Sequence, residues 1–215
     1  MFKLNVMQRI VNTGAMAIVR TNTVERGIEI AEGCLNGGVD IIEISYTFPN
    51  AGEVIKALND KFGDRLVVGA GTVLDSETAR LAILHGAKFI IAPNFSREVT
   101  KICNRYQIPY APGCTTVTEV IEALEGGASF IKAFPISNFY GPELVTILKT
   151  PLPEVPILVS GGITLDNLSD WVKRGVECCG IGGLLTKGSA VEIAENASKI
   201  CKIINQNKKT KIGVK

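Results

Sequence analysis

Gly38-Val39-Asp40-Ile41-Ile42 is the first copy of a pattern that the chain repeats: a glycine, a small apolar residue, a polar residue and then an apolar run. The pattern returns at 86–90, 127–131 and 175–179. Glycine supplies the left-handed residue that ends many helices. A short run that is apolar on both faces suits a buried parallel strand. Each copy therefore predicts a turn from a helix into a strand.

The distances between the copies indicate further strands. Their glycines stand at positions 38, 86, 127 and 175, which are 48, 41 and 48 residues apart. These distances are about twice the length of one compact strand and helix unit. Other apolar runs fill the gaps, at 15–19, 66–68, 109–111 and 157–159. The chain thus holds eight candidate strands at nearly even spacing.

Between the strands the apolar residues follow a helical period. Thr23, Asp75 and Thr118 are the expected N-caps of three of these helices, because each precedes such a stretch. In the second helix, Leu81 and Leu84 are spaced to share the apolar face. Strands and helices are therefore expected to alternate along the chain.

This alternation predicts an α/β fold, a (β/α)8 TIM barrel that forms a single domain over residues 1–215. An extra N-terminal helix near 2–11 is expected to cover the bottom of the barrel. A doubly wound open sheet is the competing architecture. It is disfavoured because the sequence lacks a G-x-G-x-x-G turn followed at about twenty residues by an acidic residue.

Composition excludes several classes of partner. The chain has 215 residues, 46% of them hydrophobic, and its 23 basic and 21 acidic residues give a net charge of +2. The one basic concentration is a C-terminal tail with Lys208, Lys209, Lys211 and Lys215, which we expect to be solvated and frayed. This is too little charge for a nucleic-acid surface. No apolar stretch suits a membrane span or a secretory signal, so we expect a cytoplasmic protein with no membrane partner.

A single histidine, His85, removes further chemistry. A Ser-His-Asp hydrolase or a zinc site with several histidines would have to use it, and its place before Gly86 at the end of a helical pattern favours a structural role. The six cysteines show no C-x-x-C spacing, which predicts reduced and mostly buried thiols. We therefore expect no metal and no cofactor.

Two charged residues stand inside strand patterns. Lys132 lies in a run with Phe130, Ile131 and Ala133, and Glu43 lies between Ile42 and Ile44. They could form a buried ion pair, or their side chains could reach solvent between helices. The functional alternative is Schiff-base chemistry, because burial lowers the pKa of an amine and raises its nucleophilic fraction. A nearby Glu43 carboxylate would oppose that shift while supplying an acid or base, and the sequence does not rank these two effects.

Glycine pairs follow the last two predicted strands. They are Gly161-Gly162, after Ser160, and Gly182-Gly183. Backbone N–H groups freed by glycine can bind an anion, and this end of a barrel is a common phosphate position. The alternative is a pair of tight turns with no ligand. Thr72, at another strand end, could donate a hydrogen bond to a carboxylate.

Several of these segments together resemble a known family. They are Arg20, 43–45 with 49–51, 68–73, 92–93, 112–113 with Thr115 or Thr116, 131–135 and 160–163. In this order they resemble the class I aldolases for 2-keto-3-deoxy-6-phosphogluconate (KDPG) and 4-hydroxy-2-oxoglutarate (KHG). The resemblance runs from about Ile10 to Leu185.

The resemblance implies a role for each residue. Lys132 would be the Schiff-base lysine and Glu43 the general acid and base. Thr72 and Pro93 would line the pocket for the pyruvyl group, and the phosphate would be bound by Gly161, Gly162, Gly182 and Gly183. The resemblance also implies a homotrimer.

Two positions depart from the family pattern. Some members carry an arginine where this chain has Thr47, so Arg20 could hold the substrate carboxylate instead. Many members carry a serine at the position of Gly183, whose hydroxyl would contact phosphate.

We therefore predict a metal-independent, Schiff-base aldolase whose partner is a phosphorylated keto acid. It would cleave KDPG to pyruvate and glyceraldehyde 3-phosphate. The alternative within the family is KHG cleavage to pyruvate and glyoxylate. Two other classes stay open: a phosphosugar isomerase or epimerase barrel, which would not need Lys132 in an apolar strand, and a noncatalytic barrel that binds a phosphorylated ligand.

Overall fold

The computed structural model describes residues 1–135 and 137–208. Its strands are β1 (Ala15–Val19), β2 (Ile41–Ser45), β3 (Val67–Gly71), β4 (Ile90–Ile91), β5 (Tyr110–Ala111), β6 (Gly113–Cys114), β7 (Ile131–Ala133), β8 (Ile157–Ser160) and β9 (Cys178–Ile181). Its helices are α1 (Phe2–Thr13), α2 (Val24–Asn36), α3 (Ala51–Phe62), α4 (Ser76–Leu84), α5 (Arg97–Tyr106), α6 (Val117–Gly126), α7 (Ser137–Tyr140), α8 (Glu143–Lys149), α9 (Leu168–Lys173), α10 (Gly183–Thr186) and α11 (Ala190–Lys208), with a 3₁₀ turn at Gly63–Arg65.

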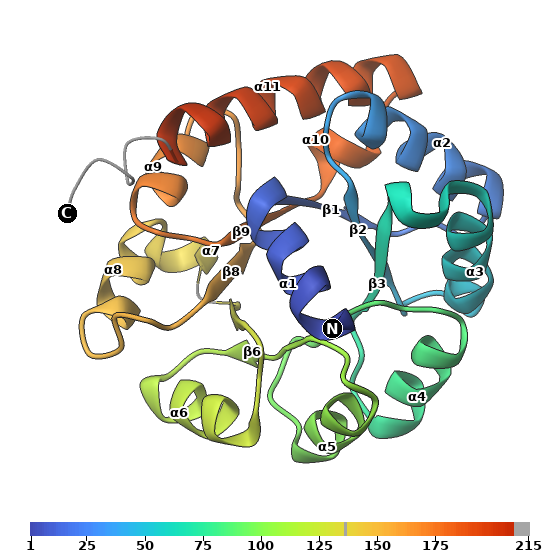
Figure 1. Ribbon diagram of the computed structural model, residues 1–215. Helices are drawn as coiled ribbons and strands as arrows, with labels where there is room; N and C mark the ends of the chain where they lie inside the picture. The colour runs from blue at the N-terminus through green and yellow to red at the C-terminus, as the bar shows by residue number, and fades with distance from the viewer. Residues whose placement is uncertain (136, 209–215) are drawn as a thin grey trace.

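The strands form a parallel barrel inside a ring of helices (Figure 1). Their order is β5-β4-β3-β2-β1-β9-β8-β7-β6, and every observed pairing is parallel. β5 and β6 flank Pro112, pair with β4 and β7 respectively, and together fill the place of the predicted fifth strand. Proline has no N–H for the ladder, although the Pro112 carbonyl still accepts a hydrogen bond from the Lys132 N–H at 2.8 Å. The predicted (β/α)8 barrel is confirmed, with one strand interrupted at proline.

The repeated glycines have the conformation that the pattern predicts. Gly38, Gly86, Gly127 and Gly175 have φ values of 92°, 95°, 98° and 100°. This is the left-handed region, which residues with a side chain rarely adopt. Each glycine therefore ends a helical segment and turns the chain into the next strand.

The extra N-terminal helix is also confirmed. α1 crosses the end of the barrel where the strands begin (Figure 1). Its Val6 and Ile10 pack against barrel-interior residues such as Met16 and Phe89. The Asp40 carboxylate accepts hydrogen bonds from two residues of α1, from Arg9 Nε at 2.6 Å and from Thr13 Oγ1 at 2.5 Å. α1 therefore covers the bottom of the barrel, and the opposite end, where the strands finish, is the place for an active site.

Lys208 differs from the predicted frayed tail. Its side chain is half-buried, and its ammonium donates hydrogen bonds to the carbonyls of Val11 and Asn12 at the end of α1. A cation at a helix C-terminus satisfies carbonyls that have no partner within the helix. Lys209, Lys211 and Lys215 lie outside the described residues.

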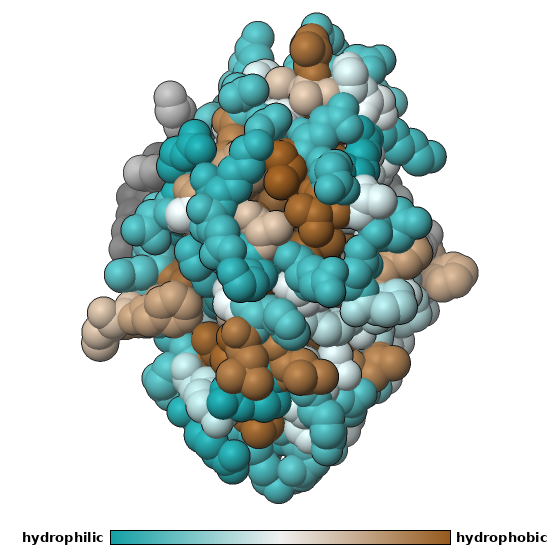
Figure 2. Space-filling model, turned by 90° about the vertical axis from the view of Figure 1, so that its right-hand side faces the viewer, coloured by the Kyte–Doolittle hydropathy of each residue, from teal (hydrophilic) through white to brown (hydrophobic). Residues whose placement is uncertain are grey.

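Two helix details were predicted wrongly. α6 begins after Thr116, not Thr118, because Thr116 and Glu119 form a reciprocal capping box. On α4, Leu81 and Leu84 are 52% and 63% exposed, since the smaller Ala79 and Ala82 face the strands. Figure 2 looks onto the side of the molecule that carries α2, α3 and α4, and apolar patches stand there among polar residues. Thr23 and Asp75 are N-caps as predicted.

The cysteines are mostly buried, and His85 contacts the backbone at the end of its own helix. Five of the six cysteines are buried, as predicted, and Cys201 is half-buried. All six are free thiols in this structure. His85 Nδ1 lies 2.8 Å from the carbonyl of Leu81, at the end of α4. In residues 1–135 and 137–208, no helix combines the length and apolarity needed to cross a bilayer.

Candidate active site

Glu43 is held inside the barrel by the alternation of β2. It pairs in register with Ile18 and Gly69, and it is 1% exposed. An ideal Cβ on Gly71 would lie only 1.7 Å from its Oε1, so the carboxylate occupies space that only a glycine leaves free. Its Oε2 is buried and accepts no hydrogen bond from the described part of the chain. A carboxylate in this setting is desolvated and open to a reacting group.

Lys132 is held in the same interior by β7. It pairs in register with Gly113 of β6 and Leu158 of β8, and it is 6% exposed. Its Nζ lies 4.8 Å from the centre of the Phe134 ring, within the range of a cation–π contact. The salt bridges found between described residues do not include one from Lys132 to Glu43. The buried ion pair that the sequence left open is therefore not formed.

The two groups affect each other electrostatically without direct pairing. Burial raises the pKa of Glu43, and the positive charges of Lys132 and Arg20 oppose this to a smaller extent. Burial lowers the pKa of Lys132; the Glu43 charge opposes that shift and Arg20 adds to it. Burial thus wins the competition that the sequence could not rank. Both shifts favour the neutral forms, which suits a nucleophilic amine and a proton-transferring carboxyl group.

Arg20, Thr72 and Pro93 follow the ends of β1, β3 and β4, at strand ends as predicted. Arg20 comes directly after β1, is exposed, and acts electrostatically on both Glu43 and Lys132. Thr72 comes after β3 with φ 58°, an unusual value for a β-branched residue. Pro93 follows β4, and its carbonyl oxygen would lie 2.0 Å from a Cβ on Gly113. The parallel strands therefore bring these residues to the same mouth.

The predicted glycine pairs lie beyond β8 and β9. Gly161 and Gly162 have φ 89° and 69°, and the Gly162 carbonyl accepts a hydrogen bond from Asn167 Nδ2 at 2.8 Å. A Cβ on Gly182 would meet nothing within 4 Å, and one on Gly183 would approach the Lys187 side chain no closer than 3.8 Å. The backbone of this second pair is thus accessible. α10 begins at Gly183 itself and is a single turn.

Two residues of the site were missed in the sequence. Ser45 follows Glu43 by two positions on β2 and also faces inward, and its Oγ lies 2.8 Å from Thr72 Oγ1. Gly71 makes room for the Glu43 side chain. The period-two alternation of a strand could have identified Ser45. The role of Gly71 depends on how β2 and β3 pair, and the sequence alone does not show that pairing.

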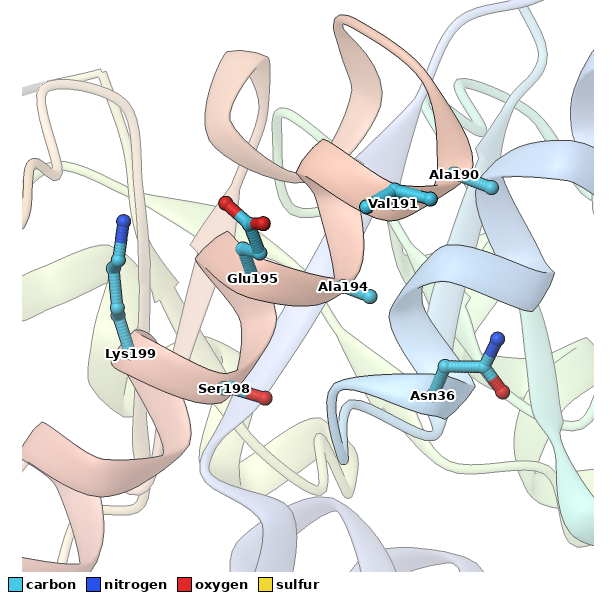
Figure 3. A pocket seen from close by; sticks show the side chains of 7 residues that line it. All are labelled: Asn36, Ala190, Val191, Ala194, Glu195, Ser198 and Lys199. Carbon is cyan, nitrogen blue, oxygen red and sulfur yellow. The ribbon is translucent and has the colours of Figure 1, made fainter.

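A groove on the outer ring of helices is separate from this site. It has a volume of about 550 Å³ and lies between α2 and α11. Figure 3 shows Asn36 of α2 on one side and Ala194 and Ser198 of α11 on the other. No buried charged group lines it. The buried charged groups, Glu43 and Lys132, lie instead at the barrel mouth.

Removal of metal ions is expected to leave activity unchanged. The described residues hold no group of three or more His, Cys, Asp or Glu side chains suited to a metal ion, and the amine of Lys132 offers a route that uses none. Prolonged treatment with a chelator, followed by an assay of turnover, checks this. Loss of activity that zinc or another divalent ion restores would contradict it.

Comparisons with known proteins agree with this geometry. A family model described as KDPG and KHG aldolase matches residues 6–203. The 2-dehydro-3-deoxy-6-phosphogalactonate aldolase of Escherichia coli (strain K12) is 35% identical over 179 residues, which cover 82% of this chain and 87% of the relative.

Solved structures show the same likeness. One described as native KDPGal matches with a TM-score of 0.85 and 31% identity, over 91% of this chain and 96% of that one. Another is the KDPG aldolase from Legionella pneumophila with pyruvate captured at low pH as a covalent carbinolamine intermediate. It matches with a TM-score of 0.79 and 25% identity, over 93% and 96% of the two chains. The chain therefore belongs to the KDPG and KHG aldolase family, whose members are carbon–carbon lyases.

Proposed function

We propose that Lys132 and Glu43 carry out a lysine-dependent aldol cleavage that releases pyruvate. The observation that carries the proposal is the burial of both groups at one mouth, with the pKa of Lys132 lowered and that of Glu43 raised. Neutral Lys132 attacks the C2 ketone of the substrate. The resulting carbinolamine loses water to give an iminium ion, which can accept an electron pair.

Glu43 moves the protons of the reaction. In its neutral form it first protonates the hydroxyl that leaves the carbinolamine as water. The carboxylate formed in this way then removes the proton from the C4 hydroxyl, directly or through water, while the C3–C4 bond breaks and its electron pair enters the iminium. The aldehyde leaves, and an enamine remains on Lys132. Protonation at C3 and hydrolysis of the new imine then release pyruvate and restore the amine. The capture of pyruvate as a carbinolamine in the Legionella pneumophila relative supports the first step.

The substrate carboxylate is assigned to the mouth beside β1, β3 and β4. Thr72 would donate a hydrogen bond, Arg20 would supply positive charge, and Pro93 would contact the pyruvyl group. The exposed guanidinium of Arg20 already lowers the pKa values of Lys132 and Glu43. Arg20 is therefore close enough to stabilise a carboxylate that binds at this mouth.

We assign the phosphate to the backbone of Gly161, Gly162, Gly182 and Gly183. Freed N–H groups bind an anion without a cationic side chain, and the open space over Gly182 supports this assignment. The substrate would then be KDPG, cleaved to pyruvate and glyceraldehyde 3-phosphate. The galactonate epimer, which differs at C4 and gives the same products, is the second candidate because a 35% identical relative is named for it.

A substrate panel tests this assignment. Rates should be compared for KDPG, its galactonate epimer and KHG, which would give pyruvate and glyoxylate. We expect higher kcat/KM for the phosphorylated acids, because KHG has no phosphate for the glycine pairs. A preference for KHG would overturn the phosphate assignment while leaving the lysine chemistry intact. Family membership disfavours the isomerase, epimerase and noncatalytic alternatives.

Gly162→Val is expected to raise KM for the phosphorylated substrate much more than for KHG. The side chain would crowd the backbone donors, and φ 69° would strain any residue other than glycine. Steady-state kinetics on both substrates check this, with KHG reporting general damage to the fold. Equal losses on both substrates would mean damage alone, and no loss on either would remove the phosphate site. Gly183→Ser restores the hydroxyl that many relatives carry, and there is room for it.

We also propose that the chain works as a cytoplasmic homotrimer. The exposed leucines on or beside α4, Leu74, Leu81 and Leu84, support burial against another protomer. Light scattering on the purified protein tests the assembly, and a mass of one chain would contradict it.

A further inference from the structure

Ser45 is a buried hydroxyl that the proposed reaction does not yet use. It ends β2 two residues after Glu43, so both side chains face the barrel interior. Ser45 is 1% exposed. Its Oγ lies 2.8 Å from Oγ1 of Thr72, which is its side-chain partner within the described ranges. This contact joins a fully buried group to a residue at the mouth.

Thr72 has an unusual backbone conformation for a threonine. Its φ of 58° lies in the left-handed region, where a β-branched side chain is strained. Its neighbour Gly71 pairs in register with Ser45, and Gly71 accepts a hydrogen bond from the Tyr46 N–H at 2.8 Å. The strand pairing and the hydroxyl contact therefore fix both the backbone and the side chain of Thr72.

The need to bind a carboxylate decides which of the two hydroxyls, Ser45 or Thr72, donates the hydrogen bond between them. A hydroxyl carries one proton, and a carboxylate only accepts hydrogen bonds. If Thr72 donated to Ser45, it would have no proton left for a carboxylate. If Ser45 donates to Thr72, the buried proton of Ser45 is satisfied and the proton of Thr72 is free to point to the mouth. A donor that itself accepts a hydrogen bond is also polarised and donates more strongly.

We propose that Ser45 is a positioning residue for the carboxylate of the keto acid, acting through Thr72. This inference rests on the aldolase function proposed above. Arg20 supplies charge to the same carboxylate from an exposed side chain, so Thr72 is the directional contact. Loss of the Ser45 hydroxyl should therefore weaken the binding of ketones that carry a carboxylate and spare those that do not.

Pyruvate and acetone provide matched probes, because acetone has a methyl group in place of the carboxylate. Each is reduced onto the protein with borohydride over a range of ketone concentrations, and the adduct is measured by intact mass. The variants are Ser45→Ala, Ser45→Thr, which retains a hydroxyl, and Ser129→Ala. Ser129 is a buried control before β7, at the opposite end of the barrel, and its Oγ accepts a hydrogen bond from the Tyr110 N–H at 3.3 Å.

Ser45→Ala should raise the half-saturating pyruvate concentration about tenfold and change that for acetone by less than about twofold. Ser45→Thr should recover most of the loss, and Ser129→Ala should match wild type. Equal losses for both ketones, or an unchanged pyruvate value, would overturn the role of Ser45 while the wild-type adduct still supports the aldolase. Absence of any pyruvate adduct in wild type would overturn both.

Discussion

Replacement of Lys132 by alanine is expected to lower turnover by about 10⁴- to 10⁶-fold, the scale seen when a covalent nucleophile is removed. The side chain is 6% exposed and makes no ion pair with another described residue. Its burial as a cation contributes no stability, because burial lowers its pKa. The variant should therefore remain folded. Stopped or steady-state assays of pyruvate release, with circular dichroism as a check on folding, measure both effects.

Lys149→Ala is the matched control for this experiment. Lys149 is also partly buried, but it lies on α8 and forms an ion pair with Glu177 at 2.8 Å. Its loss should lower stability and leave turnover nearly unchanged. If Lys132→Ala kept turnover within about tenfold of wild type, Lys132 would not be the nucleophile.

Glu43→Gln is expected to lower kcat by about 10²- to 10⁴-fold, the usual contribution of a positioned acid or base. The amide keeps the size of the side chain and removes its ability to exchange a proton. KM should change less than kcat, because the mechanism uses Glu43 for proton transfer more than for binding. Steady-state kinetics on the preferred substrate separate the two constants. Near-normal turnover would return Glu43 to a structural role.

Gly71→Ala tests the same carboxylate from the neighbouring strand. The added Cβ would lie 1.7 Å from Glu43 Oε1, so the carboxylate must move although its chemistry is unchanged. A large loss of kcat is expected here too. Gly126→Ala provides the control, because a Cβ at that position has contacts no closer than 3.4 Å and lies on α6, outside the site. Equal activity in Gly71→Ala and Gly126→Ala would show that the position of Glu43 is not critical.

The barrel could be predicted because its signals are local. A glycine that must be left-handed, followed by a buried run, defines a turn wherever it occurs, and Gly38, Gly86, Gly127 and Gly175 all have that conformation. Which residues of a helix are buried was harder to predict from the sequence. The spacing of Leu81 and Leu84 fits a buried face, but the buried residues of α4 are the smaller Ala79 and Ala82.

The site could be predicted in part for the same reason. Charged residues inside apolar strands stand out, so Lys132 and Glu43 are visible in the sequence. The sequence does not show how burial and charge together shift the pKa values of Lys132 and Glu43. Those shifts depend on how deeply each side chain is buried and on the charge of Arg20. The contacts of Ser45 with Thr72 and of Gly71 with Glu43 arise from the register of β2 and β3. Such partners appear only when the strands are paired.

Borohydride reduction of the wild-type protein with pyruvate tests the central claim most directly. The account predicts that one reduced pyruvyl group is added per chain, that activity is lost in parallel, and that peptide mass spectrometry locates the group on Lys132. Lys132→Ala should accept none. An adduct on another lysine, or no adduct in a protein that remains active, would contradict the proposed chemistry.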